Sequence, residues 1–206
     1  HKMYDLRISH NYGINESDMK IINDIDNIDI SESYYIKKLQ IINSNEFVNI
    51  ESLPEKLVLP KVIEGALPNN ESEIALVESL QGSYNIGDEI FFVSTNTDSN
   101  ILKRYQFKVV GFVQGADHIE VSNNNLANKD YFGYVKKDVF KFENVSGVNI
   151  KLKNINYKYS DKAYITEVNK TRDNLIEKFK VQQNIDEKNY LEKNNKKLNE
   201  NEKVIN

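Results

Sequence analysis

Alternating apolar and polar side chains predict strands near both ends of the chain. Residues 4–9 (YDLRIS) and 148–153 (VNIKLK) follow this period of two, which is typical of a strand with one buried face. Gly13 is expected to end the first strand, because glycine interrupts regular elements. Two further strands are predicted at 30–42 and 47–50, so the N-terminal region is predicted to form a strand-helix-strand layer.

The helix of this layer is predicted directly after the first strand. Asn15 is a suitable cap, and Glu16 and Asp18 place negative charge near the helix N-terminus, where it is favourable. The helix is expected to span about three turns. Its apolar stripe consists of Ile21, Ile22, Ile25 and Ile28.

A second, long helix is predicted near the end of the chain. Ser160 is expected to cap it. Its apolar stripe consists of Ile165, Val168, Leu175, Ile176 and Phe179. From about Asp186 the stripe thins, and the apolar residues that repeat at seven positions are Leu191, Leu198 and Ile205. Lys and Glu surround them, which is typical of a solvated helix or of half a helical hairpin. We therefore expect residues 186–206 to begin a frayed helical or coiled-coil arm.

The middle of the chain is predicted to be mainly β. All three prolines, Pro54, Pro60 and Pro68, fall at its start and indicate a change of subdomain. Residues 105–113 form the strongest strand pattern, and residues 94–100 and 114–129 are expected to be loops. Further elements are a strand at 73–77, a helical turn at 78–80, a strand at 89–93 and a mixed strand and short helix at 131–142.

These elements predict an α+β fold. We expect an α+β, porter-like subdomain formed by residues 1–55 and 143–185, and a mainly β subdomain formed by residues 56–142. The arm at 186–206 follows the first of these.

Composition excludes several classes of function. The chain of 206 residues has a formal net charge of −4, with Lys interleaved among Asp and Glu. Nucleic acids and anionic membrane surfaces attract clustered cations, so neither is expected as a partner. The absence of cysteine excludes disulfides, thiolate nucleophiles and cysteine-ligated zinc. No apolar run approaches the roughly 20 residues of a membrane-spanning helix.

A catalytic or metal site is not expected from the remaining residue types. Asp117, His118 and Glu120 could offer three metal ligands, but they are adjacent in sequence and have no second cluster, so a solvated loop is the better interpretation. His10 also lies in an expected loop. Tyrosines that could form a binding surface, or cover sheet edges and core rims instead, are Tyr34, Tyr35, Tyr157 and Tyr159.

Four short motifs occur in a set order through the middle of the chain. They are EGALP at 64–68, EIALV at 73–77, IGDEI at 86–90 and FKVVGFV at 107–113. This ordered set resembles the extracytoplasmic domain of FtsX-like and MacB-type ABC transporter permeases. Ala66 stands where that family usually has Arg, so a contact made by that Arg is lost here. Gly65, Gly87 and Gly111 are expected to permit turns or close packing, and Pro68 to fix a bend.

Other segments extend the resemblance. The YGI turn at 12–14 and the YFGYV segment at 131–135 are similar to parts of such domains in Gram-positive permeases, and the terminal helix is similar to their coiled-coil insertion. His1-Lys2-Met3 looks like a remnant of cloning, and we interpret both ends as cuts in a longer protein.

The resemblance implies a non-catalytic, MacB-like module without a cofactor or metal. It would transmit or sense conformational change for the export, release or sensing of a substrate on the extracytoplasmic side of the cell membrane, and the fragment itself would be soluble. Its partners would be the permease's transmembrane helices, a separate cytoplasmic ATP-binding subunit, and a second permease copy or partner protein. The alternative is a secreted ligand-binding or adhesion module; a carboxylate hydrolase is a third, disfavoured possibility.

Overall fold

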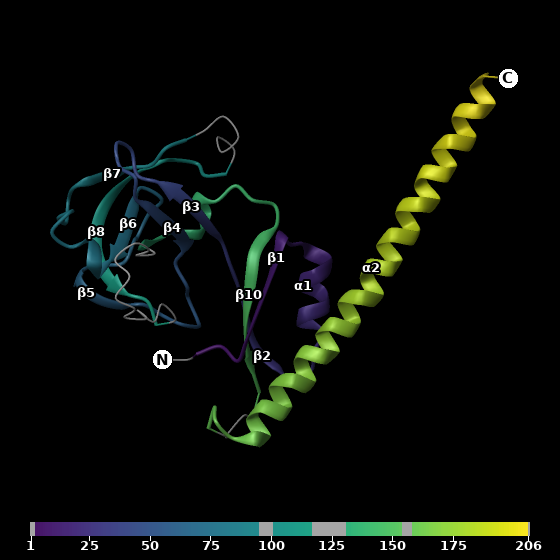
Figure 1. The fold of residues 1–206 in the computed structure, drawn as a ribbon, viewed down its shortest axis with the longest axis horizontal. Coiled ribbons are helices and arrows are strands. Elements are labelled where there is room, and N and C mark those ends of the chain that lie inside the picture. Colours follow the sequence, from purple (N-terminus) through teal and green to yellow (C-terminus); the bar gives the residue numbers. More distant parts are fainter. Residues whose placement is uncertain (1–2, 95–100, 117–130, 154–157, 206) are drawn as a thin grey trace. The chain divides into compact units, whose positions relative to one another are not determined.

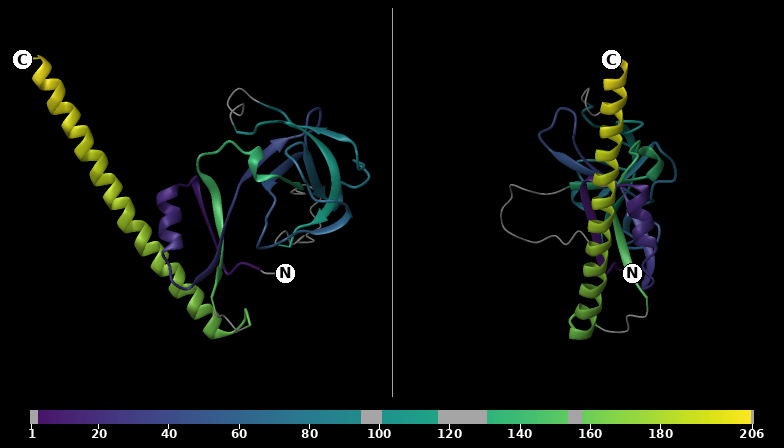
Figure 2. Two further views of the ribbon diagram at one scale, coloured as in Figure 1. Left: turned by 180° about the vertical axis from the view of Figure 1, so that it is seen from behind. Right: turned by 90° about the vertical axis from the view of Figure 1, so that its right-hand side faces the viewer.

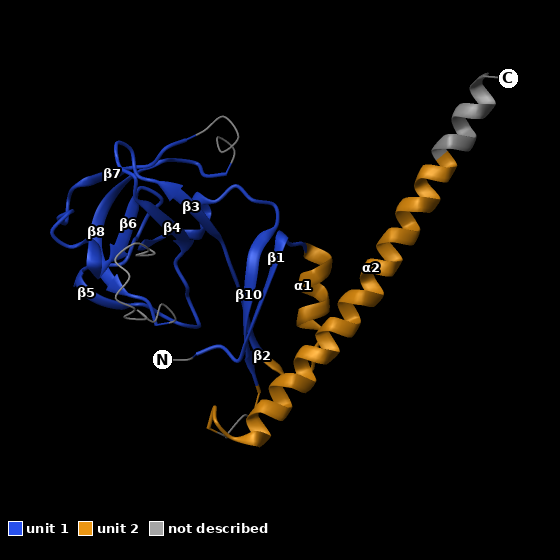
Figure 3. Ribbon diagram, in the orientation of Figure 1, with its two compact units in different colours: residues 1–15, 29–152 blue, residues 16–28, 153–206 orange. Residues whose placement is uncertain are grey.

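The computed structural model describes residues 3–94, 101–116, 131–153 and 158–205, with side chains described as far as residue 196. The chain divides into two compact units (Figure 3). Unit 1 consists of residues 1–15 and 29–152, and unit 2 of residues 16–28 and 153–206. The fold class is α+β, as predicted: strands form two sheets in unit 1, and unit 2 is helical (Figure 1).

The smaller sheet of unit 1 joins the two ends of that unit. Its strands are β1 (Leu6–Ile14), β10 (Val145–Leu152) and β2 (Ile28–Tyr34), in the order β1-β10-β2. Strands β1 and β10 are antiparallel, with Leu6 opposite Ile150 and Ile8 opposite Val148. Val148 and Ile150 are fully buried, which confirms the apolar face predicted for this strand.

The prediction that Gly13 ends the first strand is wrong. Strand β1 continues to Ile14, with an irregular register between Ser9 and Ile14. Gly13 has φ +79°, and a Cβ there would lie 2.6 Å from Cβ of Asn144. Glycine therefore lets the strand bend closely past residue 144 rather than stop.

The larger sheet follows the order β3-β4-β9-β6-β8-β5, and β7 also pairs with β8. Its strands are β3 (Ile36–Gln40), β4 (Phe47–Ser52), β5 (Lys61–Gly65), β6 (Glu73–Val77), β7 (Glu89–Phe91), β8 (Gln106–Gln114) and β9 (Tyr131–Val135). The end of β3 returns to the end of β7: Ile41 bridges Phe92, Ile42 N–H donates to Phe91 O, and Val93 N–H donates to Gln40 O. Strands β3-β4-β9-β6-β8-β7 thus close into a barrel, which leaves no open edge between β3 and β7.

The barrel encloses the main hydrophobic core. Phe92, Phe107 and Phe112 are among its largest fully buried side chains. Phe107 and Val109 point inward as the alternating pattern predicts, but Phe112 is buried too. The register of β6 against β8 skips Val110, with Ile74 opposite Val109 and Ala75 opposite Gly111. This bulge shifts the alternation of buried and exposed side chains by one residue. Odd- and even-numbered residues of β8 therefore both contribute buried side chains to the core.

Several predicted elements are confirmed with small changes of boundary. The strand at Glu73–Val77 and the 3-10 turn η1 (Glu78–Leu80) lie where they were predicted. The mixed segment at 131–142 contains β9 and a second 3-10 turn, η2 (Lys137–Val139).

Two N-terminal strands pair differently from the prediction. The expected strand at 30–42 is interrupted at Tyr35, so that β2 joins the smaller sheet and β3 joins the barrel. Strand β4 pairs with β3 on one side and in parallel with β9 on the other. Strands β3 and β4 therefore do not belong to the strand-helix-strand layer, because both lie in the larger sheet. The subdomain limits at 55 and 143 stay a proposal.

Unit 2 contains α1 (Glu16–Asn23) and α2 (Lys162–Ile205). Helix α1 has eight residues and is shorter than predicted, because Ile25 lies in the turn that follows it and Ile28 begins β2. Helix α2 has 44 residues and runs without interruption through the proposed arm (Figure 2). Nothing in the described part of the chain forms a helix apolar and long enough to cross a membrane.

The predicted Ser160 cap of α2 is wrong by one residue. The helix begins at Lys162, so Asp161 occupies the position before it, and the Asp161 carboxylate accepts Lys158 N–H at 3.0 Å. Farther along, buried Thr171 ties the helix to the turn after α1. Its hydroxyl accepts Asn27 Nδ2 at 2.6 Å and donates to Glu167 O at 3.0 Å.

Candidate functional site

The four sequence motifs converge on strand β8. Strand β5, which ends in the first motif, pairs antiparallel with β8, and β6, the second motif, pairs with it in parallel. The turn of the third motif bonds one residue of β8 twice, since Gly87 N–H donates to Val109 O and Val109 N–H donates to Asp88 O, each at 2.8 Å. Segments spread over residues 64–113 are therefore immediate neighbours in space.

Gly65 and Gly111 lie opposite each other in this assembly and allow a close backbone approach. Gly65 has φ +73°, in the left-handed region that favours glycine. A Cβ on Gly111 would come 2.7 Å from Ala66 N and 2.8 Å from Glu64 O, both of them backbone atoms. Gly87 has φ +100° with open space around it. The structure thus confirms close packing at Gly65 and Gly111 and a turn at Gly87.

The metal-ligating side chains that the structure describes are dispersed. Among described residues, no group of three His, Cys, Asp or Glu side chains lies close enough to hold a metal ion. His10 accepts Tyr12 N–H at 3.3 Å and contacts the Tyr12 ring. The candidate ligands Asp117, His118 and Glu120 lie outside the described residues.

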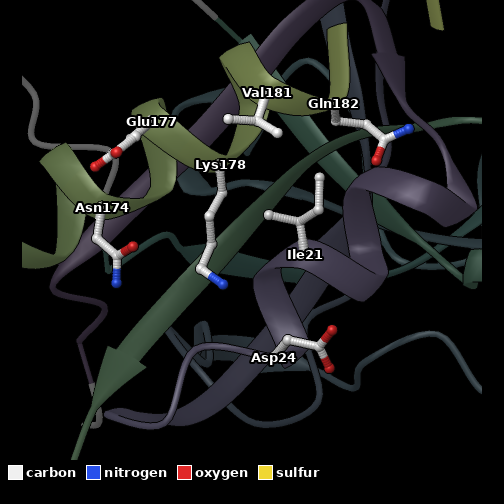
Figure 4. A pocket seen from close by; sticks show the side chains of 7 residues that line it. All are labelled: Ile21, Asp24, Asn174, Glu177, Lys178, Val181 and Gln182. Atoms are coloured by element: carbon white, nitrogen blue, oxygen red, sulfur yellow. The ribbon is translucent and has the colours of Figure 1, made fainter. Parts of the chain in front are cut away.

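A shallow groove runs between the two helices of unit 2 (Figure 4). Ile21 and Asp24 line it from the side of α1, and Asn174, Glu177, Lys178, Val181 and Gln182 line it from α2. Val181 remains about half exposed. The groove combines two apolar side chains with charged side chains of both signs that face solvent, so it is a seam of helix packing.

Tyr35, one of the tyrosines predicted to form a binding surface or to cover a sheet edge, connects β2 of the smaller sheet to β3 of the barrel. Its ring stacks on Phe140 at 5.2 Å and on Phe142 at 6.0 Å between centroids. Of the other three tyrosines in that group, Tyr34 lies beneath the Arg7 guanidinium. Tyr159 contacts the Tyr164 ring, and Tyr157 lies outside the described residues.

Burial raises the pKa of Tyr35 above its ordinary value of 10.0. Because the folded state holds this proton more tightly than the unfolded state, the free energy of unfolding is unaffected below pH 10 and falls as the pH rises beyond it. Urea unfolding between neutral pH and about pH 11 should show this loss. The loss should be smaller in Tyr35→Phe, which keeps the ring and lacks the titrating hydroxyl; an identical alkaline loss in that variant would contradict the raised pKa of Tyr35.

Glu32 is a further residue that the sequence patterns missed. Its Oε1 accepts N–H of Glu55 and Lys56 at 2.7 and 2.9 Å, and its Oε2 accepts N–H of Leu57 at 2.7 Å. The next residue, Val58, is buried with φ +56°, a strained conformation for a β-branched side chain that persists only where its surroundings hold it. The Glu32 carboxylate thus fixes a strained loop from a distant strand.

We expect Glu32→Gln to lower the free energy of unfolding by about 1.5 kcal/mol, because the amide nitrogen cannot accept the N–H groups that one carboxylate oxygen now accepts. Hydrogen exchange of the Leu57 amide measures the effect locally. Glu55→Gln, an exposed carboxyl change in the same loop, serves as the control and should change protection by less than about 0.5 kcal/mol.

Comparison with known proteins gave matches among solved structures. No protein-family model and no curated protein matches the chain. The extracellular domain of the noncanonical ABC-type transporter YknZ from Gram-positive bacteria matches with TM-score 0.46 and 10% identity, over 77% of this chain and 80% of that one. The periplasmic region of MacB from Actinobacillus actinomycetemcomitans matches with TM-score 0.45 and 12% identity, over 79% and 75%.

A domain of a permease protein from Porphyromonas gingivalis matches with TM-score 0.41 and 12% identity, over 79% of this chain and 71% of that one. The first two matches are thus an extracellular domain and a periplasmic region, and the third is a domain of a permease protein.

Proposed function

We propose that this chain is the extracytoplasmic domain of an ABC transporter permease of the FtsX-like and MacB type. The observation that carries the proposal is the convergence of the four motifs on β8, because each motif glycine occupies a position where a side chain would collide or strain the backbone. The four motifs thus form one connected part of the larger sheet around β8, as expected if they identify a shared fold.

In this proposal the domain catalyses no reaction and responds to movement generated elsewhere. ATP would be hydrolysed by a separate cytoplasmic subunit, and the permease's transmembrane helices would pass the movement to this domain. The closed barrel favours such a role, since a barrel without an open seam deforms less than isolated hairpins. Export, release or sensing of a substrate outside the membrane would be the result.

Helix α2 is the proposed arm for a second permease copy or a partner protein. Beyond Gln182, every described side chain of α2 as far as residue 193 is exposed, including Ile185, Tyr190 and Leu191. Such a helix gains little from packing on its own unit, so a partner would stabilise it.

Purification of the full-length protein from membranes in mild detergent tests the assignment. We expect an ATP-binding subunit to copurify, ATP hydrolysis to depend on that subunit, and the 206-residue chain alone to hydrolyse no ATP. A full-length protein that is released into the medium and associates with no ATP-binding protein would favour the secreted binding or adhesion module instead.

A further inference from the structure

The barrel is an insertion within the smaller sheet, joined to it by two connections. Strand β2 of the smaller sheet leads through Tyr35 into β3, and the chain returns through residues 141–144 into β10. We call residues 32–36 and 137–146 the neck. An insertion with two connections can hinge about them unless other contacts cross between its parts.

Aromatic stacking joins the two connections directly. Tyr35 comes from the outgoing segment, and Phe140 and Phe142 come from the returning one. The three rings lie at centroid distances of 5.2, 6.0 and 6.1 Å with interplanar angles of 15–25°. Phe140 belongs to the buried core of the barrel, and Tyr35 and Phe142 pack against that core. The stack therefore fixes both connections to the barrel at one place, and the neck can hinge freely there only if the stacked rings separate and become exposed to water.

Polar contacts hold the same segment from both sides. Lys137 Nζ donates to Ser33 Oγ at 2.8 Å and lies 5.6 Å from the Tyr35 ring centroid. The Tyr35 backbone bonds Ser52 twice, since Tyr35 N–H donates to Ser52 Oγ and Ser52 N–H donates to Tyr35 O, each at 2.9 Å. Ser146 Oγ accepts Ile36 N–H at 3.0 Å.

The loop held by Glu32 adds a third connection, which is not covalent. Glu32 lies on β2 in the smaller sheet, whereas residues 55–57 follow the barrel strand β4. A hinge motion at Tyr35 would carry the Glu32 carboxylate away from three N–H donors at once. Leu57 is fully buried, so its N–H would lose its partner in a dry environment, which is costly.

We propose that Tyr35, Phe140 and Phe142 form a clamp that locks the barrel to the smaller sheet, so that the two move as one rigid body. The clamp holds both connections together at the same place, and the hydrogen bonds of Lys137 and Glu32 hold the neighbouring segments in position. This inference depends only on contacts within unit 1. It therefore holds whether or not the chain belongs to a transporter.

Distance measurement by pulsed electron paramagnetic resonance tests the clamp. The chain has no cysteine, so Asn11→Cys in β1 and Lys108→Cys in β8, both exposed positions, give one spin label on each sheet. In the otherwise unchanged chain we expect one narrow distance distribution. Tyr35→Leu combined with Phe142→Leu should broaden it about twofold or more, because the neck is then free to hinge.

Tyr84→Leu is the matched control, because it removes a partly buried ring that packs on the barrel core away from the neck. This variant should leave the distribution narrow. If the double variant does not fold, Lys137→Met tests the neck in a second way, since it keeps all three rings and removes the bond from Lys137 to Ser33, and it should broaden the distribution to a smaller extent. A broad distribution in the unchanged chain, no broadening in the neck variants, or equal broadening in Tyr84→Leu would overturn the proposal.

Discussion

Gly111→Ala is expected to destabilise the barrel by about 3 kcal/mol or more. The backbone of Gly111 has no positive φ, so the new methyl group acts only through its volume. It would come 2.7 Å from Ala66 N and 2.8 Å from Glu64 O. Backbone atoms cannot move aside as the end of a flexible side chain can, so strand β5 would have to separate from β8.

Gly82→Ala is the control for this substitution. Gly82 has φ +91° with nothing within 4 Å of a built Cβ, so alanine there costs only the conformational penalty of about 1 kcal/mol. Hydrogen exchange of β6 and β8 amides measures both variants better than far-UV circular dichroism, in which helix α2 dominates. If Gly111→Ala lowered the free energy of unfolding no more than Gly82→Ala does, the backbones of β5 and β8 would not be closely packed at Gly111.

Asp5→Asn should also cost about 3 kcal/mol, in the smaller sheet. The Asp5 side chain is fully buried, and Lys151 beside it is mostly buried. Asp5 Oδ1 accepts Lys151 Nζ at 2.9 Å, and Asp5 Oδ2 accepts Leu152 N–H at 2.7 Å. An amide in the same place turns an NH₂ group toward one of these two donors and leaves the Lys151 charge without its counter-charge.

The exposed pair of Lys103 and Glu71 provides the comparison. Its N–O distance is 2.7 Å, but both side chains are nearly half exposed. Water screens such a pair, so Glu71→Gln should cost less than about 1 kcal/mol. Thermal unfolding of the two variants, with exchange of β10 amides as the local measure, compares the costs. If Asp5→Asn and Glu71→Gln lowered the stability equally, burial of Asp5 would add nothing to the effect of an exposed ion pair.

Local patterns predicted the elements whose neighbours are close in sequence or whose turns depend on glycine. Strands β6 and β8 and the turn at 78–80 were predicted with small errors of boundary. The roles of Gly65 and Gly111 were predicted from their motifs, because backbone conformation and close approach constrain residue type directly.

Pairings between distant segments could not be predicted in the same way. The run at 30–42 is apolar enough for one strand, yet Tyr35 interrupts it because β3 turns away to pair with β4 and to meet the end of β7. Gly13 suggested a stop, but the neighbouring segment at residue 144 decides that the strand continues. The contacts with the end of β7 and with residue 144 lie more than 50 positions away and leave no local period.

The neck was missed for the same reason. Tyr35 and the pair Phe140 and Phe142 come from segments about 100 residues apart, and each alone is an ordinary aromatic residue between regular elements. Glu32 sits in an alternating strand, where a carboxylate is normally read as a solvent-facing position. Only the fold brings its oxygens to the loop at 55–57.

The side of the membrane on which this domain lies is the most direct test of the proposed function. Tyr12 is 85% exposed, so Tyr12→Cys, as the single cysteine of the full-length protein, provides a reactive thiol at the surface. Intact cells are treated with a membrane-impermeant maleimide, and membranes washed with alkaline carbonate are then analysed. We predict full labelling in intact cells on a protein that stays in the washed membranes. Labelling only after lysis, or loss of the protein from those membranes, would contradict the assignment to a permease.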